Sequence, residues 1–496
     1  MKSTVSSKES STKFRRTASF AGAALLAACS HTATALPPHF SHALVGGSWS
    51  VADRRKLDAR IEAALKPLDG RAAESAVVFA ARGAPLFQKN AARALAPAST
   101  LKLIVASTSL HELGLRYRFH TRLAAAGLEP GGIVPGDVYL IGSGDPLLTS
   151  NDLRGGVKTL WNDGVRQIDG GVVVDATALR GPERNAFWDA TDAFEDYSSA
   201  TSAVSLDQDT IELHVRPTQV GAPARVFLEP PTSAVQHDDD VLTGPEGSWT
   251  DITILPKIAP NAFAVSGRVA SGPHDAIYYL NVSNVPLYVA DVLELMLEAR
   301  GIAPRDAPRI GIAPQGTHAL WEHPSPPLHE IVRKMLYESN NHAAEQLLRT
   351  LGRLHGGAGD DRSGLDAERR FLAGQGVPAG GMRIVDGSGL SDTNRVSATT
   401  LATILVRAET WSSGNPLYLA LPQGGKEGTL RNYPFSGALG RVRAKSGHIS
   451  GVSALAGYVT THQHGRIAFA IIVNSEVPNV DADRSIVQAV DAMADF

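Results

Sequence analysis

Two patterns of apolar and polar residues alternate along this chain. Near both ends, apolar residues recur at helical spacing or form short runs that are almost uninterrupted. Residues 53–68 have the helical pattern, whereas the runs at 454–459 and 467–473 have the length and composition of buried strands. Between residues 116 and 300, short apolar segments alternate with Gly, Pro and Asp turns, a pattern that favours strands. We therefore expect an α/β (α+β) protein with a strand-rich insertion.

The positions of individual elements follow from the same pattern. A strand, a turn and a second strand are predicted over residues 76–87, and Pro97 then opens a helix that Gly114 ends. Further strands are predicted at 138–141, 171–174, 211–215, 252–255 and 278–282. Further helices are predicted at 287–300, 328–351 and 486–494. The predicted parts are a discontinuous domain, residues 48–115 and 301–496, and an inserted part, residues 116–300.

The first 35 residues have the pattern of an export signal, because basic residues precede a short apolar stretch. Leu26-Ala27-Ala28-Cys29 resembles a lipoprotein cleavage box, in which Cys29 is acylated. Two alternatives stay open, ordinary cleavage after Ala33-Thr34-Ala35 and an uncleaved anchor. Residues 36–47 are polar and contain Pro, as in a tether. Each alternative predicts a protein of the periplasm or cell envelope, whose only membrane contact is at this terminus.

Composition excludes several classes of partner. The 496 residues carry a net charge of −3, which gives no basic field for nucleic acid. One cysteine cannot form an internal disulfide or a cysteine-rich metal site. His111-Glu112 and His329-Glu330 each begin a zinc-peptidase pattern, but Leu115 and Arg333 stand where the second His is needed. We expect neither a metal nor another cofactor.

Three short motifs carry the candidate chemistry. They are Ser99-Thr100-Leu101-Lys102, Ser339-Asn340-Asn341 and Lys445-Ser446-Gly447. Their order matches the signature of serine acyl-transferases that β-lactams inhibit, with 240 residues from Ser99 to Ser339. The first two motifs also occur by chance, as Ser10 to Lys13 and as Ser413-Gly414-Asn415, whereas no second Lys-Ser/Thr-Gly occurs. The hypothesis of a serine acyl-transferase therefore rests on the order of the three motifs and on the third motif.

The spacing within each motif predicts a role for its side chains. Ser99 and Lys102 are three residues apart and share a helix face, so a neutral Lys102 can take the Ser99 proton. Burial or the charge of Lys445 would lower the Lys102 pKa as this role requires. Ser339 and Asn341 do not share a helix face, and we place them where a helix meets a loop.

The third motif is expected on a strand, where Lys445 and Gly447 share a face. Lys445 and the Ser446 hydroxyl suit a terminal carboxylate, and Gly447 lets a substrate backbone lie close.

Ser339 is assigned a proton relay, and the Asn341 amide holds the substrate backbone. An oxyanion formed at the attacked carbonyl requires N–H donors, which we assign to Ser99 and His448.

Together these features resemble the class C low-molecular-mass penicillin-binding proteins, which are D-alanyl-D-alanine carboxypeptidases and endopeptidases. The further matching segments are Ala96-Pro97-Ala98-Ser99, Gly142-Ser143-Gly144-Asp145-Pro146, Asp386-Gly387-Ser388-Gly389-Leu390-Ser391 and Gly428-Thr429-Leu430. The resemblance implies a penicillin-binding transpeptidase/β-lactamase-like fold, an antiparallel sheet flanked by helices, with domains inserted between the first two motifs. It implies acylation of Ser99, with peptidoglycan peptide stems as substrates and β-lactams as inhibitors.

The resemblance also implies an aspartate in the insertion that contacts the amino group of the diaminopimelate side chain. Asp192 is the best positional match, with Asp189 and Asp196 as alternatives. Two positions depart from the family pattern: His448 replaces a small hydroxyl residue and Asp392 replaces an arginine. The rival hypotheses are a β-lactamase or esterase on the same fold, and a catalytically weak cell-wall-binding lipoprotein.

Overall fold

The computed structural model describes residues 48–81, 83–411, 413–476 and 478–496. The predicted signal, residues 1–35, the candidate lipid site Cys29 and the tether, residues 36–47, lie outside these ranges. Among the residues that the structure describes, no helix is both long and apolar enough to cross a membrane.

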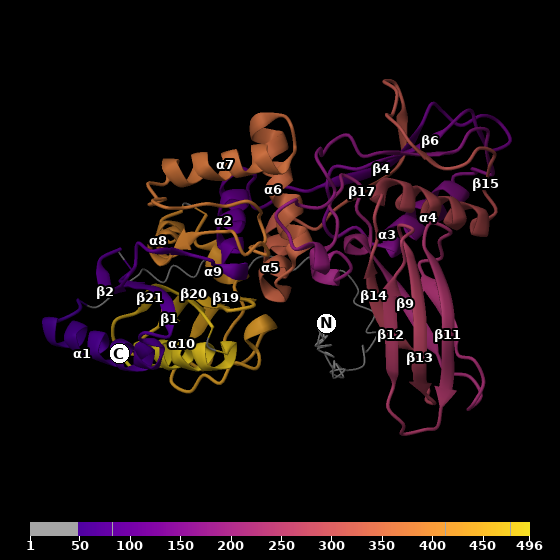
Figure 1. Ribbon diagram of the computed structural model, residues 1–496. Helices are drawn as coiled ribbons and strands as arrows, with labels where there is room; N and C mark the ends of the chain where they lie inside the picture. Colours follow the sequence, from indigo (N-terminus) through magenta and orange to yellow (C-terminus); the bar gives the residue numbers. More distant parts are fainter. Residues whose placement is uncertain (1–47, 82, 412, 477) are drawn as a thin grey trace, which may run out of the picture. The chain divides into compact units, whose positions relative to one another are not determined.

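A five-stranded antiparallel sheet joins the two ends of the described chain, with the strand order β19-β20-β21-β1-β2 (Figure 1). Its strands are β1 (Ala72–Phe79), β2 (Pro85–Lys89), β19 (Val442–Ile449), β20 (Val452–Thr460) and β21 (Arg466–Ser475). The short strands β3 (Ala94–Leu95) and β18 (Val396–Ser397) form a separate pair. The predicted strands near both ends of the chain and the antiparallel sheet are confirmed.

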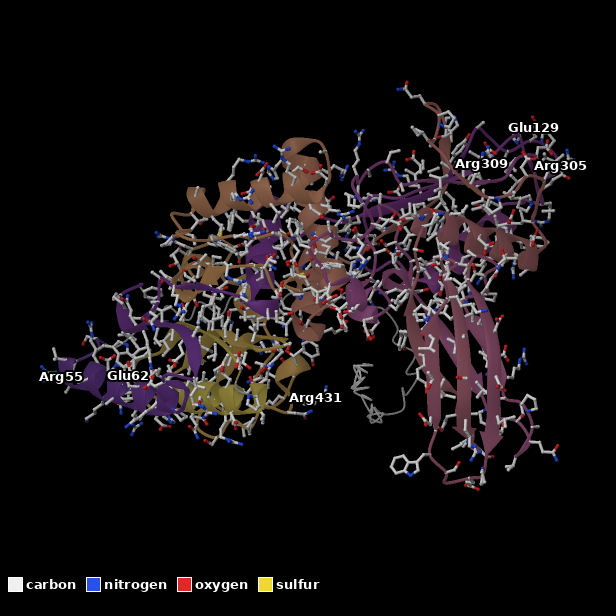
Figure 2. The ribbon with its side chains drawn as sticks, viewed as in Figure 1. Arg55, Glu62, Glu129, Arg305, Arg309 and Arg431 are labelled. Carbon is white, nitrogen blue, oxygen red and sulfur yellow. The ribbon has the colours of Figure 1, made fainter. Side chains whose placement is uncertain are left out.

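Helices cover both faces of this sheet, because alternate residues of its strands are apolar on opposite sides. In β20, Ala454, Ala456 and Tyr458 pack with α2, α5, α6 and α8, whereas Leu455 and Val459 pack with α1 and α10. The charged residues Arg55 and Glu62 of α1 are exposed (Figure 2). The helices are α1 (Val51–Leu65), α2 (Lys102–Glu112), α5 (Leu328–Glu338), α6 (Asn341–Gly356), α7 (Asp361–Gly374), α8 (Ala398–Ala408), α9 (Pro416–Ala420) and α10 (Asn479–Ala494).

Two predicted helices differ from those observed. The helix expected over residues 328–351 is divided into α5 and α6, because Ser339 has a left-handed φ of 60° and Asn340 caps the start of α6. The helix expected from Pro97 begins as a 3₁₀ turn, η2 (Ala98–Leu101), and becomes α-helical at Lys102. Other 3₁₀ turns are η1 (Lys66–Leu68), η3 (Ala190–Asp192), η4 (Asp196–Ser198), η5 (Asp207–Asp209) and η6 (Gly428–Leu430).

The middle of the chain forms four further sheets around its own apolar core, together with α3 (Ser150–Asn162) and α4 (Val285–Arg300). One sheet is β16-β8-β6-β4-β17, from β4 (His120–Ala125), β6 (Val138–Ile141), β8 (Val172–Asp175), β16 (Arg309–Ile310) and β17 (His318–Pro324). The second is β10-β9-β14, from β9 (Thr210–Arg216), β10 (Arg225–Glu229) and β14 (Ala276–Asn281). The third is β11-β13-β12, from β11 (Gln236–Gly244), β12 (Asp251–Pro256) and β13 (Ala262–Ala270). The fourth is β15-β7-β5, from β5 (Ile133–Val134), β7 (Gln167–Ile168) and β15 (Ala303–Pro304).

The strand pairing extends this middle part beyond residue 300. β17 pairs with β4, and β16 pairs with β8, so residues 309–324 belong to a sheet of the middle part. The sequence analysis places these residues in the discontinuous domain, because pairings between segments distant in sequence leave no local pattern. The next segment, α5, packs in the other core.

Asn474 of β21 fixes the backbone that leads to Ser99. Its Oδ1 accepts a hydrogen bond from the Ala96 N–H at 2.8 Å, and its Nδ2 donates to the Ala96 carbonyl at 2.9 Å. One side chain therefore satisfies both backbone groups of a buried residue.

Replacing this amide by an apolar side chain of similar size should destabilise the fold. In Asn474→Leu both backbone groups of Ala96 lose their partners, and we expect the free energy of unfolding in urea to fall by about 1–3 kcal/mol. Asn162→Leu, at an exposed position at the end of α3, is the matched control and should change it by less than about 0.5 kcal/mol. Equal stability of the two variants would contradict this role of Asn474.

Candidate active site

Ser99 and Lys102 lie together at the junction between η2 and α2. Lys102 is completely buried, and its Nζ lies 3.0 Å from Ser99 Oγ. Nζ also donates hydrogen bonds to Asn341 Oδ1 at 2.6 Å and to the Ser388 carbonyl at 2.7 Å. Asn341 and Ser388 are distant from Lys102 in sequence, so the fold brings Ser99, Lys102 and Asn341 into one cluster.

The partners of Lys102 orient its amine. Asn341 Oδ1 and the Ser388 carbonyl can only accept hydrogen bonds, so each takes one N–H of a neutral amine. The remaining lone pair then faces Ser99 Oγ, which is the group whose proton a base must take. The Asn341 amide is itself oriented, because its Nδ2 donates to the Tyr197 carbonyl at 2.7 Å.

Burial lowers the pKa of the Lys102 amine, as its role as a base requires. It lowers the pKa of Lys102 from 10.5 to about 7, although the carboxylates of Asp386 and Glu345 act in the opposite direction. Burial also lowers the pKa of Lys445 well below its usual value, and the charge of Lys102 adds to this effect. The sequence had offered burial or Lys445 as the cause at Lys102, and burial is the dominant one.

The second motif occupies the break between α5 and α6. Ser339 adopts the left-handed conformation there, and Asn340 Oδ1 accepts a hydrogen bond from the Ala343 N–H. Ser339 and Asn341 both line a polar cavity of about 670 Å³, which also touches residues of the middle part. The predicted placement between a helix and a loop therefore agrees with the structure.

The third motif lies on β19, as the strand pattern predicts. Lys445 is buried and donates to the Ser446 carbonyl at 2.7 Å, while the Ser446 hydroxyl donates to Thr429 Oγ1 at 3.0 Å. A Cβ on Gly447 would lie 2.7 Å from the Pro97 carbonyl and 3.0 Å from the Ser99 N–H. The glycine therefore admits the chain's own backbone next to Ser99. Its expected contact with a substrate backbone stays a prediction.

His448, at the exposed end of this motif, belongs to a side-chain cluster that the sequence did not indicate. Its Nε2 lies 2.9 Å and 3.1 Å from the two carboxylate oxygens of Asp483, and 3.3 Å from the Tyr433 hydroxyl. These partners come from α10 and from the segment after η6. These contacts hold the His448 side chain at the surface, whereas its backbone remains part of β19 beside Gly447.

Asp192, the predicted substrate contact, lies in η3 of the middle part. It accepts a hydrogen bond from the Tyr197 hydroxyl at 2.9 Å. Tyr197 also accepts the Asn341 amide through its carbonyl, so Asp192 is connected to the second motif through one residue. Of the two alternatives, Asp189 caps η3 by accepting from the Thr191 N–H, whereas Asp196 lines the cavity.

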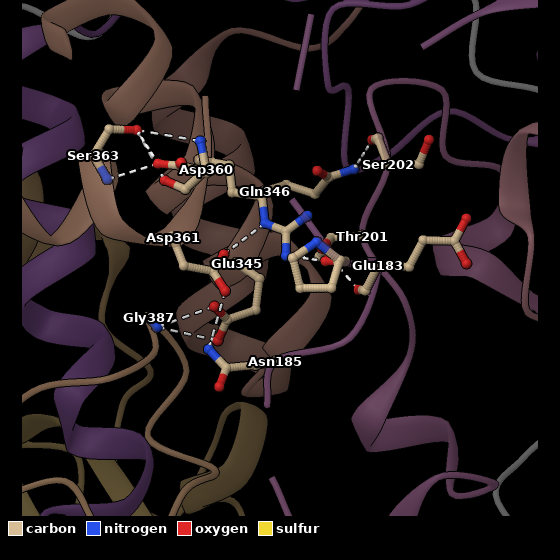
Figure 3. Close-up of polar contacts among 12 residues, drawn as sticks. Glu183, Asn185, Thr201, Ser202, Glu345, Gln346, Asp360, Asp361, Ser363 and Gly387 are labelled. Atoms are coloured by element: carbon tan, nitrogen blue, oxygen red, sulfur yellow. Dashed lines mark hydrogen bonds and ion pairs between the residues drawn. The ribbon is translucent and has the colours of Figure 1, made fainter. Parts of the chain in front are cut away.

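A buried carboxyl group behind Lys102 was missed by the sequence interpretation. Glu345 of α6 accepts a hydrogen bond from the Gly387 N–H at 3.1 Å (Figure 3). It also accepts one from the Ser388 N–H at 2.8 Å. It therefore fixes the loop whose Ser388 carbonyl accepts from Lys102. Burial raises the pKa of Glu345 to about 8, and the Asp386 carboxylate adds to this shift. Its position one helical turn after Asn341 was the available signal.

A neighbouring face of α6 contacts the middle part. Gln346 Nε2 donates to the Ser202 carbonyl at 2.7 Å (Figure 3), and His342 Nδ1 lies 2.9 Å from the Ala200 carbonyl. A few residues earlier in the chain, Trp188 Nε1 donates to Asp386 Oδ2 at 3.0 Å. α6 thus joins the second motif, the Ser388 loop and the segment that carries Asp192.

Comparison with known proteins identifies the family. The model of the D-Ala-D-Ala carboxypeptidase 3 (S13) family matches residues 54–495, and the chain belongs to this family. It is 32% identical over 463 residues to a D-alanyl-D-alanine carboxypeptidase of an Actinomadura species, covering 87% of this chain and 84% of the relative. It is 25% identical over 396 residues to D-alanyl-D-alanine carboxypeptidase DacB of Haemophilus influenzae, covering 78% of this chain and 81% of that protein.

The fold is likewise that of a known structure. Penicillin-binding protein 4 (dacB) from Haemophilus influenzae matches with a TM-score of 0.76 and 21% identity, covering 88% of this chain and 99% of that one. The predicted penicillin-binding fold is therefore confirmed. The protein is an enzyme, a serine-type D-Ala-D-Ala carboxypeptidase, which confirms the predicted activity.

The lowered pKa of Lys102 predicts how acylation depends on pH. Below about pH 7 Lys102 is protonated and cannot take the Ser99 proton, whereas above it the amine is free. We expect the acylation rate constant with a fluorescent penicillin to fall about tenfold per pH unit below about pH 7 and to level off above it. Circular dichroism over the same range controls for unfolding, and equal rates at about pH 6 and about pH 8 would contradict a Lys102 base.

The close approach of β19 to η2 predicts the effect of Gly447→Ala. The added Cβ must push the strand away from Ser99, because its nearest neighbours are backbone atoms. We expect the acylation rate constant to fall about tenfold or more, since small misplacements of reacting groups are costly. Gly127→Ala, whose Cβ would meet no atom within 4 Å, is the control. Unchanged acylation in Gly447→Ala would refute the need for this contact.

Proposed function

We propose that Ser99 is the nucleophile and Lys102 the base of an acyl-enzyme mechanism. The observation that carries the proposal is the buried Lys102 amine 3.0 Å from Ser99 Oγ. Burial lowers the pKa of this amine to about 7, which suits a base. Lys102 takes the hydroxyl proton as Oγ attacks the carbonyl of the D-Ala-D-Ala amide. The proton passes through Ser339 to the leaving amine, and the C-terminal D-alanine departs. Water then hydrolyses the Ser99 ester and regenerates the enzyme.

The same proposal assigns the remaining site residues. Lys445 and the Ser446 hydroxyl bind the terminal carboxylate of the substrate, whose negative charge favours the charged form of Lys445. The N–H groups of Ser99 and His448 stabilise the oxyanion, since Gly447 lets β19 approach Ser99. Asn341 both orients Lys102 and holds the substrate backbone.

Asp192 is assigned to the amino group of the substrate side chain in the same proposal. Its connection to Asn341 through Tyr197 supports a position beside the bound peptide. We further propose that residues 48–115 and the segment from α5 onward form one catalytic domain. The residues between them contribute to substrate choice, because they contact the second motif.

Peptidoglycan peptide stems are the proposed substrates, and cleavage of cross-links uses the same steps with a larger leaving group. β-Lactams are the proposed inhibitors, which acylate Ser99. Haemophilus influenzae penicillin-binding protein 4, complexed with a novel β-lactam, matches this fold with a TM-score of 0.71 and 20% identity. We place the enzyme in the cell envelope of a bacterium, in the periplasm or held by a lipid on Cys29.

One experiment separates this function from its rivals. The protein is incubated with a fluorescent penicillin and with a peptide that ends in D-Ala-D-Ala, beside Ser99→Ala. We expect lasting labelling and release of D-alanine, and neither from Ser99→Ala, which lacks the nucleophile. Ser413→Ala, at an exposed serine of the chance Ser-Gly-Asn sequence, should behave as wild type.

Each other outcome has a definite meaning. Rapid penicillin turnover without D-alanine release would favour a β-lactamase. Hydrolysis of simple esters alone would favour an esterase. The absence of both labelling and D-alanine release would leave only a binding role in the cell wall.

A further inference from the structure

Three consecutive residues of the middle part have left-handed backbone conformations. Asp207, Gln208 and Asp209 have φ values of 48°, 62° and 59°. This region is unfavourable for L-residues, although Asp and Asn tolerate it better than others. Gln208, at the centre of the turn, is not one of these residue types, so its left-handed backbone is strained. Strained backbone of this kind concentrates at functional sites, where the surrounding structure holds it in place.

The flanking aspartates hold the turn at both ends. Asp207 Oδ1 accepts a hydrogen bond from the Ser150 N–H at the start of α3, at 3.1 Å. The completely buried Asp209 accepts from the Leu206 N–H at 3.0 Å and from the Ser205 hydroxyl at 2.9 Å. These bonds fix the backbone on either side of Gln208.

The Gln208 side chain contacts the second motif. Gln208 Oε1 accepts a hydrogen bond from Asn340 Nδ2, on the residue between Ser339 and Asn341. The other end of the Asn340 amide is already engaged, because its Oδ1 accepts from the Ala343 N–H at 2.7 Å. Asn340 is therefore held at both ends, once by its own helix and once by the strained turn.

We propose that Gln208 is a positioning residue for catalysis, which acts through Asn340 to set the backbone of Ser339 and Asn341. The inference rests on the proposed function, in which those two residues act on Lys102 and the substrate. Ser339 is itself left-handed, with a φ of 60°, so the loop needs an external contact to hold it. The turn supplies that contact from a segment remote in sequence.

Two substitutions at Gln208 separate the hydrogen bond from the volume of the side chain. Gln208→Met keeps the length and removes the acceptor, whereas Gln208→Glu keeps an acceptor oxygen. Both side chains have room, because Gln208 and Asn340 line the cavity of about 670 Å³. We expect Gln208→Met to lower kcat for D-alanine release, and the acylation rate constant, by about fivefold with KM unchanged. Gln208→Glu should stay within about twofold of wild type.

A third variant separates positioning from stability. Gln208→Gly removes the acceptor and also relieves the left-handed strain, so we expect activity to fall as in Gln208→Met while Tm stays the same or rises. A merely structural residue would instead lose activity only where Tm falls. Gln219→Met, on an exposed loop, is the matched control and should change neither quantity.

The outcomes are distinguishable from a failure of the proposed function. If wild type is acylated and Gln208→Met equals it, the inference on Gln208 is overturned and the proposed function stands. Activity losses that merely follow Tm, or an equal loss in Gln208→Glu, also overturn it. A wild-type protein that is neither acylated nor releases D-alanine overturns both.

Discussion

Burial of the Lys102 amine is the constraint on which the rest of the site depends. An amine without solvent needs partners for its N–H groups, and Asn341 Oδ1 and the Ser388 carbonyl provide them. The same burial lowers its pKa to about 7, and the placement of the two acceptors directs the lone pair to Ser99. Desolvation, which is costly for an isolated charge, is here the source of a usable base.

α6 is the element that satisfies this constraint. Asn341 and Glu345 are four residues apart on one face and reach Lys102 directly and through the Ser388 loop. His342 and Gln346 share another face and reach the middle part. One helix therefore couples the orientation of the base to a segment that is separate in sequence. The middle part therefore contacts the helix that orients the base.

Sequence patterns predicted the elements that carry strong periodicity or special chemistry. Strands of the five-stranded sheet and several strands of the middle part were predicted in this way. The order of the motifs singled out Ser99, Lys102 and Lys445 as candidate site residues. α3 and α7 were missed, although Thr149 and Asp360 cap them with side-chain bonds that their sequences permit. Gln208 and the pairing of β17 depend on contacts between distant segments, and no local pattern encodes them. Glu345 has only the weak local signal of its spacing from Asn341, because its bonds to the Ser388 loop also join distant segments.

Residues outside the three motifs hold the backbone of the motifs in place. Ala98 directly precedes the first motif, and Ser339 begins the second. Both are non-glycine residues in the left-handed conformation, as are the three residues of the Gln208 turn. Each is unfavourable by itself, so each requires contacts from elsewhere to persist. Asn474 holds the backbone at Ala96, two residues before Ala98, and the Gln208 turn holds Asn340, the residue after Ser339. The active site is therefore held by its surroundings on both sides, and substitutions outside the three motifs can alter the rate without touching the substrate.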